Sequence, residues 1–142
     1  MDKKPDFQVL VETAKSKSGE IIISPFIKVG GVSAALLTTS GNIYVGVCID
    51  TSCSLGMCAE RNAIANMLTN GESNIEKLVC YFENGTIGIP CGACREYLMQ
   101  LDDRNGELDI LVDAQSMKSV KLKSLLPEWW GNNYYSNSNE KV

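Results

Sequence analysis

Three cysteines and one glutamate have the types and the spacing of a catalytic metal site. Cys58 precedes Glu60 by two residues, and Pro90 opens a downstream segment in which two residues separate Cys91 from Cys94. Three thiolate ligands leave a tetrahedral zinc ion with one open position, which is typical of catalytic rather than structural sites. A glutamate beside that position can move protons to and from a water molecule held there. The pattern therefore predicts metal-assisted hydrolysis.

Other interpretations of the cysteines stay open at the level of sequence. Cys91 and Cys94 alone could form a redox-active dithiol, although such pairs favour an early βαβ unit that this chain lacks. A closed structural zinc site needs a fourth ligand, and the chain has no histidine. Cys48, Cys53 or Cys80 would have to supply it, with Cys53 the leading candidate. We expect Cys48 and Cys80 to pack as ordinary buried cysteines.

Length and composition indicate a globular protein. The chain has 142 residues, of which 44% are hydrophobic and 21% charged, and its net charge is -4. We expect a single domain over residues 1–142, with about 132–142 as a flexible tail. The sequence shows no basic cluster that would favour a nucleic-acid polymer as partner. It also shows no secretory signal and no long apolar run, so we expect a cytoplasmic protein without a membrane partner.

The elements that must position the candidate site alternate between helices and strands. The apolar periodicity predicts helices over residues 7–17, 58–69 and 91–101, and one helical turn within 124–130. It predicts a hairpin of strands 33–38 and 43–49 around the turn 40–42, and further strands over 77–82, 108–112 and 120–122. Residues 21–32 are expected to form a loop with short extended pieces. The alternation favours an α/β fold, a three-layer α/β/α domain around a mixed sheet.

Both sulfur-bearing segments lie where a loop becomes a helix. The first turn of a helix presents unpaired N–H groups and partial positive charge, which offset the negative charge of three thiolates. Arg61 adds supporting positive charge beside Glu60. On helical spacing Glu60 shares a face with Ala63, Ile64 and Met67, so we expect its carboxyl group to face apolar surroundings near the metal.

These motifs resemble those of the zinc-dependent cytidine deaminases, including their blasticidin-S deaminase branch. Residues 58–64 (CAERNAI) resemble the first motif of the family, and residues 90–96 (PCGACRE) resemble the second. Residues 33–46 resemble its first two strands, and residues 125–127 with the aromatics that follow resemble its C-terminal end. The resemblance implies the cytidine-deaminase-like fold, with a five-stranded mixed sheet flanked by helices. It also implies a homotetramer, with a dimer as the other possibility, in which neighbouring subunits help to close each pocket.

Carried over position by position, the resemblance assigns a role to each motif residue. It implies that Cys58, Cys91 and Cys94 bind one zinc ion per chain. It implies that Glu60 takes a proton from the attacking water, protonates N3 of the pyrimidine and then delivers a proton to the departing amine.

The implied substrate contacts depart from the family pattern. Cytidine deaminases hold the ribose with Asn-x-Glu after the second strand, where this chain has Cys48 and Asp50. The family's aromatic residue that packs on the base aligns with Gly30 of this chain, and Phe26 lies nearby in the sequence. The family's C-terminal aromatic residue aligns with Trp130, which could instead serve as a packing anchor for the tail. The full set of expected substrate contacts is Ala59, Pro90, Asp50, Cys48, Phe26 and Trp130.

The resemblance predicts zinc-dependent hydrolytic deamination of a free cytosine nucleoside, cytidine or deoxycytidine, to the uracil nucleoside and ammonia. This is a reaction of pyrimidine salvage. Blasticidin S is the alternative substrate, because its deaminases also lack the glutamate that holds the ribose. A non-catalytic, zinc-stabilised relative that only binds a nucleoside is a lesser alternative.

Overall fold

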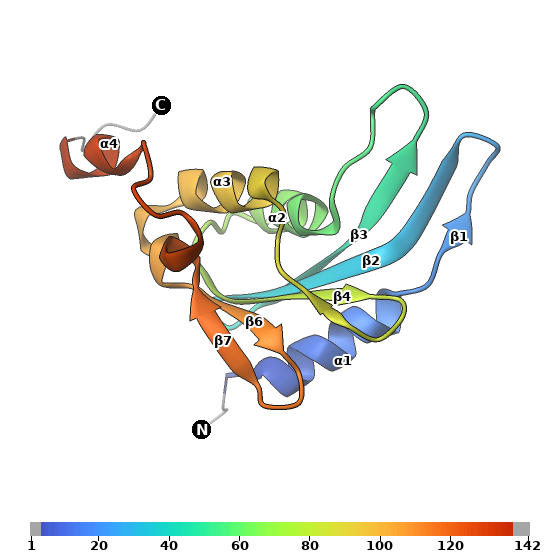
Figure 1. The fold of residues 1–142 in the computed structure, drawn as a ribbon, viewed down its shortest axis with the longest axis horizontal. Coiled ribbons are helices and arrows are strands. Elements are labelled where there is room, and N and C mark those ends of the chain that lie inside the picture. The colour runs from blue at the N-terminus through green and yellow to red at the C-terminus, as the bar shows by residue number, and fades with distance from the viewer. Residues whose placement is uncertain (1–3, 138–142) are drawn as a thin grey trace.

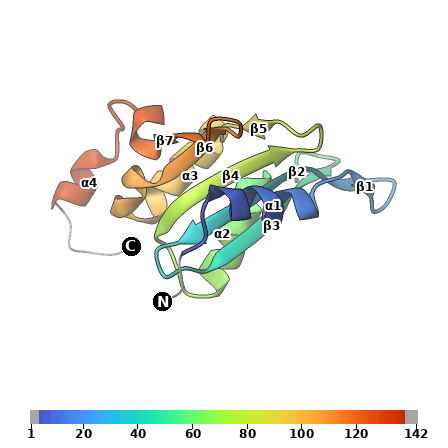
Figure 2. The ribbon, with the colours of Figure 1, turned by 90° about the horizontal axis from the view of Figure 1, so that it is seen from below.

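Helices cover both faces of a central mixed sheet in the computed structural model, which describes residues 4–137 (Figures 1 and 2). Helix α1 (Phe7–Lys17) lies on one face, and α2 (Ala59–Thr69) and α3 (Gly92–Leu101) lie on the other. The predicted three-layer α/β/α class is therefore confirmed. Among residues 4–137, none of the helices combines the length and the apolarity that crossing a bilayer requires.

Five principal strands of the described chain run in the order β3-β2-β4-β6-β7. Their bounds are β2 (Ile27–Thr38), β3 (Ile43–Thr51), β4 (Ile75–Phe82), β6 (Asp109–Asp113) and β7 (Lys118–Lys121). Strands β4 and β6 are parallel and the other neighbours are antiparallel. Two short strands add to this sheet: β1 (Ile21–Ile22) pairs with β2, and β5 (Ile87–Gly88) pairs with β4.

The apolar run in β2 divides its side chains between two cores. Ala35 and Leu37 pack with Leu10 of α1, whereas Ala34 and Leu36 pack in the core beneath α2 and α3. Successive side chains of a strand point to opposite faces, so an uninterrupted apolar run is what a strand buried on both faces requires.

The segment 21–32 is more regular than the sequence predicted. Strand β2 begins at Ile27 and passes through the glycines with a register irregularity between Val29 and Ser33. Gly30 has φ +93°, and a Cβ atom there would lie 2.3 Å from the carbonyl oxygen of Gly19. The prediction of a loop was wrong because the strand bends at this glycine instead of ending there.

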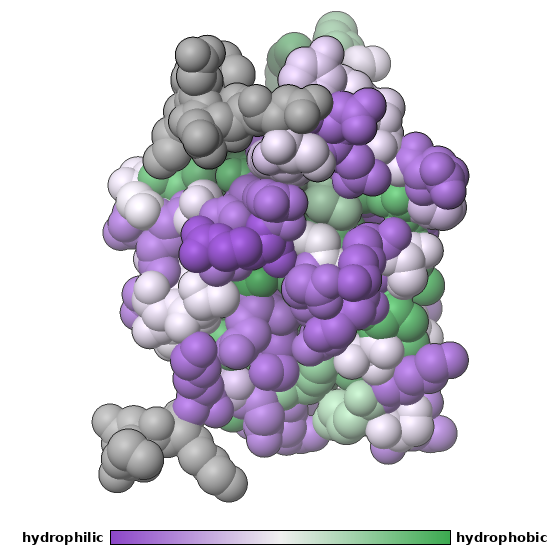
Figure 3. All heavy atoms as spheres, turned by 90° about the vertical axis from the view of Figure 1, so that its left-hand side faces the viewer, coloured by the Kyte–Doolittle hydropathy of each residue, from purple (hydrophilic) through white to green (hydrophobic). Residues whose placement is uncertain are grey.

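The chain after α3 also differs in detail from the prediction. A 3₁₀ turn, η1 (Asp103–Glu107), follows α3, and a second, η2 (Leu122–Leu125), ends before Pro127 instead of occupying residues 124–130. Residues Asn132–Asn137 form the short helix α4, and the remainder of the expected tail, 138–142, lies outside the described residues. Figure 3 looks onto the end of the molecule that carries α4, where polar residues dominate and apolar ones form separate patches.

Candidate active site

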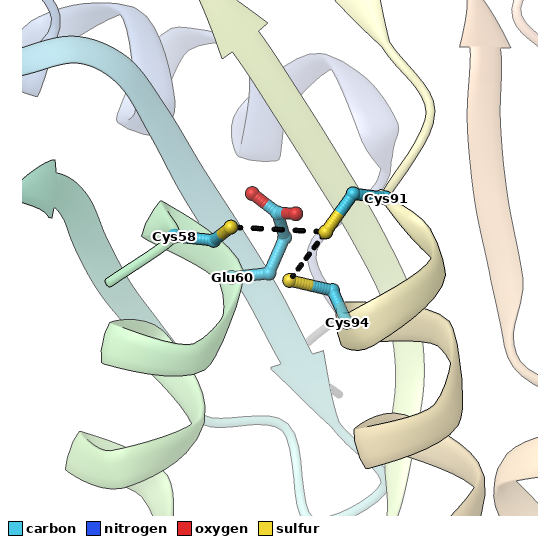
Figure 4. Close-up of side chains that lie close together, drawn as sticks. All are labelled: Cys58, Glu60, Cys91 and Cys94. Atoms are coloured by element: carbon cyan, nitrogen blue, oxygen red, sulfur yellow. Dashed lines mark hydrogen bonds between the residues drawn. The ribbon is translucent and has the colours of Figure 1, made fainter. Parts of the chain in front are cut away.

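The two cysteine motifs place their sulfur atoms in equivalent positions. Cys58 is the N-cap residue of α2 and Cys91 is the N-cap residue of α3, both with extended backbone, while Glu60 and Cys94 lie in the first turns. Figure 4 shows these four side chains directed toward one another between the two helix ends. Because helix N-termini carry partial positive charge, both helices favour thiolates at this point.

Helix α2 lies unusually close to the sheet. A Cβ atom on Gly46 of β3 would lie 2.3 Å from the backbone nitrogen of Ala63 and 2.5 Å from the carbonyl oxygen of Ala59. The absence of a side chain at this position therefore sets the height of α2, and with it the height of Cys58 and Glu60, above β3.

The sulfur geometry fits a zinc ion. The Sγ atom of Cys91 lies 3.7 Å from that of Cys58 and 3.6 Å from that of Cys94. One donor atom from each of these residues and from Glu60 lies within 4.8 Å of all the others. Three sulfurs bound at about 2.3 Å in tetrahedral geometry are separated by roughly 3.8 Å. The donor set and its spacing therefore match three thiolates around one zinc ion.

Hydrogen bonds favour the thiolate state of Cys91, the exposed sulfur of the cluster. Partial burial alone would raise the pKa of Cys91, but hydrogen bonds from Cys94 and Cys58 together lower that pKa. Burial, reinforced by the Glu60 carboxylate, raises the pKa of Cys94, and a bound dication overcomes this because a coordinating thiol is deprotonated outright. Arg61 Nη2 donates to Cys58 Sγ at 3.6 Å, and this hydrogen bond raises the pKa of the guanidinium group.

Glu60 is buried on the face that the sequence predicted. It is 5% exposed, and its helix-face neighbours Ala63, Ile64 and Met67 are fully buried in the core under α2. Its carboxylate belongs to the same cluster as the three sulfurs. This position allows Glu60 to exchange protons with a molecule bound at the metal.

A cavity of about 220 Å³, here called the inner chamber, opens onto this cluster. Its reactive wall is formed by Cys58, Glu60 and Cys91, and Cys48 also lines it. The other lining residues are apolar or weakly polar: Val32, Ala59, Cys80, Phe82 and Ile89. The chamber is smaller than the 300–1,000 Å³ usual for drug-sized ligands, so it suits a single ring rather than a whole nucleoside.

A second cavity of about 370 Å³, here called the outer chamber, adjoins the first, because Cys48 and Cys58 line both. It is more polar, and its further lining residues are Ile49, Asp50, Thr51, Ser54, Gly56, Met57 and Arg61. Thr51 Oγ1 and Arg61 Nε are buried without a hydrogen-bond partner. Buried polar atoms are normally satisfied, so these two are available to a polar ligand in the outer chamber.

Three of the expected substrate contacts lie at these chambers. Ala59 lines the inner chamber, Asp50 lines the outer one, and Cys48 lies where they meet. The thiol of Cys48 is half-buried and accepts a hydrogen bond from the backbone N–H of Val32 at 3.2 Å. The sequence thus identified residues from both chambers.

The structure does not bring the other three expected contacts to the inner chamber. The carbonyl oxygen of Pro90 accepts a hydrogen bond from Arg95 Nε at 2.8 Å, and Pro90 lines neither chamber. Phe26 is 69% exposed and lines a cavity at the β1–β2 turn, which adjoins the outer chamber because Asp50 and Thr51 line both. Trp130 donates to Glu96 of α3 at 2.9 Å and lines a cavity beside α4, which is the packing role considered as its alternative.

Several lining residues escaped the sequence reasoning. Val32, Cys80, Phe82 and Ile89 come from three separate segments, and the alternation along β4 was the one available signal, since it gives Cys80 and Phe82 the same face. Burial raises the pKa of Cys80 well above its usual value, so it stays a neutral thiol in the wall. Within residues 4–137, neither Cys80 nor the exposed Cys53 joins the metal-binding cluster.

Comparison with known proteins agrees with this geometry. A family model described as the cytidine and deoxycytidylate deaminase zinc-binding region matches residues 10–106, a range that contains both cysteine motifs. The chain is 33% identical over 125 residues to a cytidine deaminase of Sporosarcina psychrophila, covering 86% of this chain and 89% of that one. It is 30% identical over 95 residues to a cytidine deaminase of Mycoplasma genitalium, covering 66% and 73%.

A solved structure shares the fold as well. The crystal structure of cytidine deaminase from Mycobacterium tuberculosis superposes with a TM-score of 0.72 at 26% identity, covering 89% of this chain and 98% of that one. The family region that matches is zinc-binding, and the sulfur spacing fits zinc, so zinc is the metal of this site. On its sequence, its fold and its metal-binding cluster, the chain belongs to the cytidine and deoxycytidylate deaminase family.

Proposed function

We propose that this chain is a zinc-dependent hydrolase that deaminates a free cytosine nucleoside, cytidine or deoxycytidine, to the uracil nucleoside and ammonia. The observation that carries the proposal is the position of Glu60 beside three sulfurs on the wall of a chamber sized for one ring. The relatives named cytidine deaminase support the choice of substrate and favour it over blasticidin S. Retention of Glu60 disfavours a relative that only binds a nucleoside, because binding needs no proton carrier.

The residues divide the reaction between them. Cys58, Cys91 and Cys94 hold the zinc ion, which when bound acts as a Lewis acid and lowers the pKa of water. Glu60 takes the proton that the water loses as its oxygen adds to C4 of the cytosine, and gives a proton to N3. Glu60 then takes the remaining hydroxyl proton of the C4 adduct and delivers it to the amino group, so the C4–N bond breaks, the C4 carbonyl of the product forms and ammonia leaves. Arg61 offsets the charge of the thiolates.

The outer chamber favours a nucleoside over a nucleoside phosphate. Asp50 brings a carboxylate to this chamber, and the guanidinium group of Arg61 is engaged with the Cys58 sulfur. A phosphate group would therefore meet the negative charge of Asp50, and the nearby guanidinium group already shares its charge with the Cys58 sulfur and offers only its unpaired Nε. Sugar hydroxyls, by contrast, can donate to Asp50 and pair with Thr51. We assign the ring to the inner chamber and the sugar to the outer one.

We further propose a cytoplasmic, single-domain enzyme of pyrimidine salvage that assembles as a homotetramer, with a dimer as the alternative. The six cysteines are not joined in disulfides, as suits a reducing compartment. Ile22, Phe26 and Trp130 are more than half exposed, and apolar side chains of this size are typical of subunit interfaces. Light scattering coupled to size-exclusion chromatography measures the number of subunits.

The Glu60→Gln variant tests the proposal. We expect it to retain zinc and thermal stability while turnover of cytidine falls by at least about 10²- to 10⁴-fold, because general acid–base catalysis is lost. Turnover is followed by the loss of cytosine absorbance and by ammonia release. A variant that stays near the wild-type rate would show that Glu60 is not the proton carrier. Wild-type turnover of blasticidin S alone would select the alternative substrate, and turnover of none of these compounds would defeat the proposal.

A further inference from the structure

Phe82 is the aromatic residue of the inner chamber. It ends β4, and the alternation of the strand gives it the same face as Cys80 in the chamber wall. Its side chain is 38% exposed although it lines a cavity, so part of its ring surface is free for contact with a ligand. An aromatic ring with an open face beside a chamber for one ring is suited to packing against a planar base.

The backbone beneath Phe82 is shaped to receive its ring. A Cβ atom on Gly88 of β5 would lie 2.2 Å from Cε2 and 2.8 Å from Cζ of Phe82, so any other residue at this position would displace the ring. The backbone N–H of Phe82 donates to the carbonyl oxygen of Thr86 at 2.9 Å, and Val32 pairs with Phe82 across the sheet. The sheet therefore holds the backbone that carries Phe82, and the missing side chain at Gly88 leaves room for the ring.

The aromatic residues expected from the sequence do not take this place. Gly30 has no side chain, and the cavity lined by Phe26 shares no residue with the inner chamber. Trp130 is held by Glu96 in the middle of α3. Within the described chain, Phe82 therefore supplies the aromatic contact that the inner chamber would otherwise lack.

We propose that Phe82 packs its ring against the cytosine ring of the substrate, and that Gly88 sets the position of that ring. This inference rests on the proposed function and names a residue that determines how the base is held. Glu60 and the sulfurs then meet the polar edge of the base, while Phe82 contacts its apolar surface. Such a contact stabilises the bound substrate and the transition state to a similar extent. Its loss therefore raises KM more than it lowers kcat.

Substitutions of Phe82 test the contact. We expect Phe82→Leu and Phe82→Ala to lower kcat/KM for cytidine by roughly 5- to 150-fold, the range for losing one base–aromatic stacking contact. Phe82→Tyr keeps the ring and should retain most of the activity. The matched control is Tyr97→Leu, which removes an exposed aromatic ring on α3 and should leave kcat/KM unchanged. Zinc content and thermal stability of each variant show whether a loss is structural.

The Gly88→Ala variant gives an independent test of geometry. The new methyl group displaces the ring, so kcat/KM should fall in the wild-type background and change little in the Phe82→Ala background. Equal effects of Gly88→Ala in both backgrounds would overturn the role of Gly88. Wild-type kcat/KM in Phe82→Leu, or losses that follow zinc content, would overturn the contact itself.

A binding measurement separates this inference from the proposed function. Calorimetric titration with uridine, the product, needs no turnover, and Phe82→Leu should weaken uridine binding by the same factor that it lowers kcat/KM. If wild-type protein binds uridine without deaminating cytidine, the proposed reaction fails while weakened binding in Phe82→Leu still supports the contact. If the wild-type protein binds neither cytidine nor uridine, both are overturned.

Discussion

The two faces of the sheet are built from the same strands but do different things. On the face toward α1, β4 contributes Val79 and Tyr81 to an apolar core, beside which the buried Ser33 hydroxyl donates to the carbonyl oxygen of Ala14. On the face toward α2 and α3, the same strand contributes Cys80 and Phe82 to the wall of the inner chamber, opposite the buried Glu60. One face stabilises the sheet mainly by packing, while the other keeps a cavity and buried reactive groups.

The two faces together explain how the fold remains stable although its active site is less well packed than a core. A cavity and a buried carboxylate both lower stability, because they forfeit contacts and remove charge from water. The apolar core on the α1 face contributes packing that can offset those costs. On the face with the active site, a bound metal also stabilises the protein, because it binds the folded state and not the unfolded one. The comparison predicts that substitutions on the two faces have separable effects.

The largest effect is expected for the metal ligands. Cys91→Ala should lose zinc and catalysis together and lower the thermal midpoint strongly, because metal binding is coupled to folding. Zinc is measured by elemental mass spectrometry and stability by calorimetry. Cys53→Ala is the matched control, since Cys53 is exposed and lies outside the cluster, and it should retain zinc, activity and stability. A folded, fully zinc-loaded Cys91→Ala protein would contradict the ligand set.

A smaller and purely structural effect is expected on the opposite face. Leu37 is fully buried in the core under α1, so Leu37→Ala should lower the free energy of unfolding by about 2–5 kcal/mol. Its kcat/KM per folded molecule and its zinc content should match the wild type, because no residue that lines the two chambers belongs to that core. Denaturant unfolding and initial-rate kinetics on the same preparation check this. A specific loss of kcat/KM would mean that the two faces are coupled.

The smallest effect concerns a hydrogen-bonded clamp that joins Glu72 to Tyr44 and Asn42. Glu72 accepts hydrogen bonds from Tyr44 Oη at 2.7 Å and Asn42 Nδ2 at 2.9 Å, and the Tyr44 bond is the main reason that the pKa of Glu72 falls from 4.5 to about 2. A carboxyl group whose pKa is lower in the folded state stabilises the protein above its unfolded pKa, and this contribution disappears as the pH falls through the folded pKa.

The stability difference between wild type and Glu72→Gln should therefore be constant near neutral pH, shrink below about 4.5 and vanish near about 2. Urea unfolding at several pH values measures this difference. Tyr44→Phe removes the same hydrogen bond and should reproduce the trend. A difference that does not change with pH would show that the clamp does not depend on the charge of Glu72.

Local signals explain what the sequence predicted well. The helix Phe7–Lys17, the hairpin around residues 40–42 and the helix starts at Cys58 and Cys91 all follow from periodicity and turn residues that lie within one segment. The metal-binding cluster follows because each motif fixes its own sulfurs at a helix N-terminus. These features need little knowledge of how distant segments pack.

Long-range pairing explains what the sequence did not predict. The inner chamber is complete only when β2, β4 and the segment before α3 bring Val32, Phe82 and Ile89 together. Phe26 and Trp130 were expected at the base because of their positions along the chain; in this chain Phe26 lines the cavity at the β1–β2 turn and Trp130 donates to Glu96. No spacing rule within one segment encodes these placements.

Gly46 is not a reactive residue, yet the alignment of the metal site depends on its lack of a side chain. A methyl group there would act as a wedge between β3 and α2, tilting Cys58 away from the two sulfurs on α3 while every chemical group remained present. Such a protein would keep both cysteine motifs, but its metal-binding cluster would be misaligned. An intact signature in a related chain is therefore informative about catalysis only when the residue under the helix is equally small.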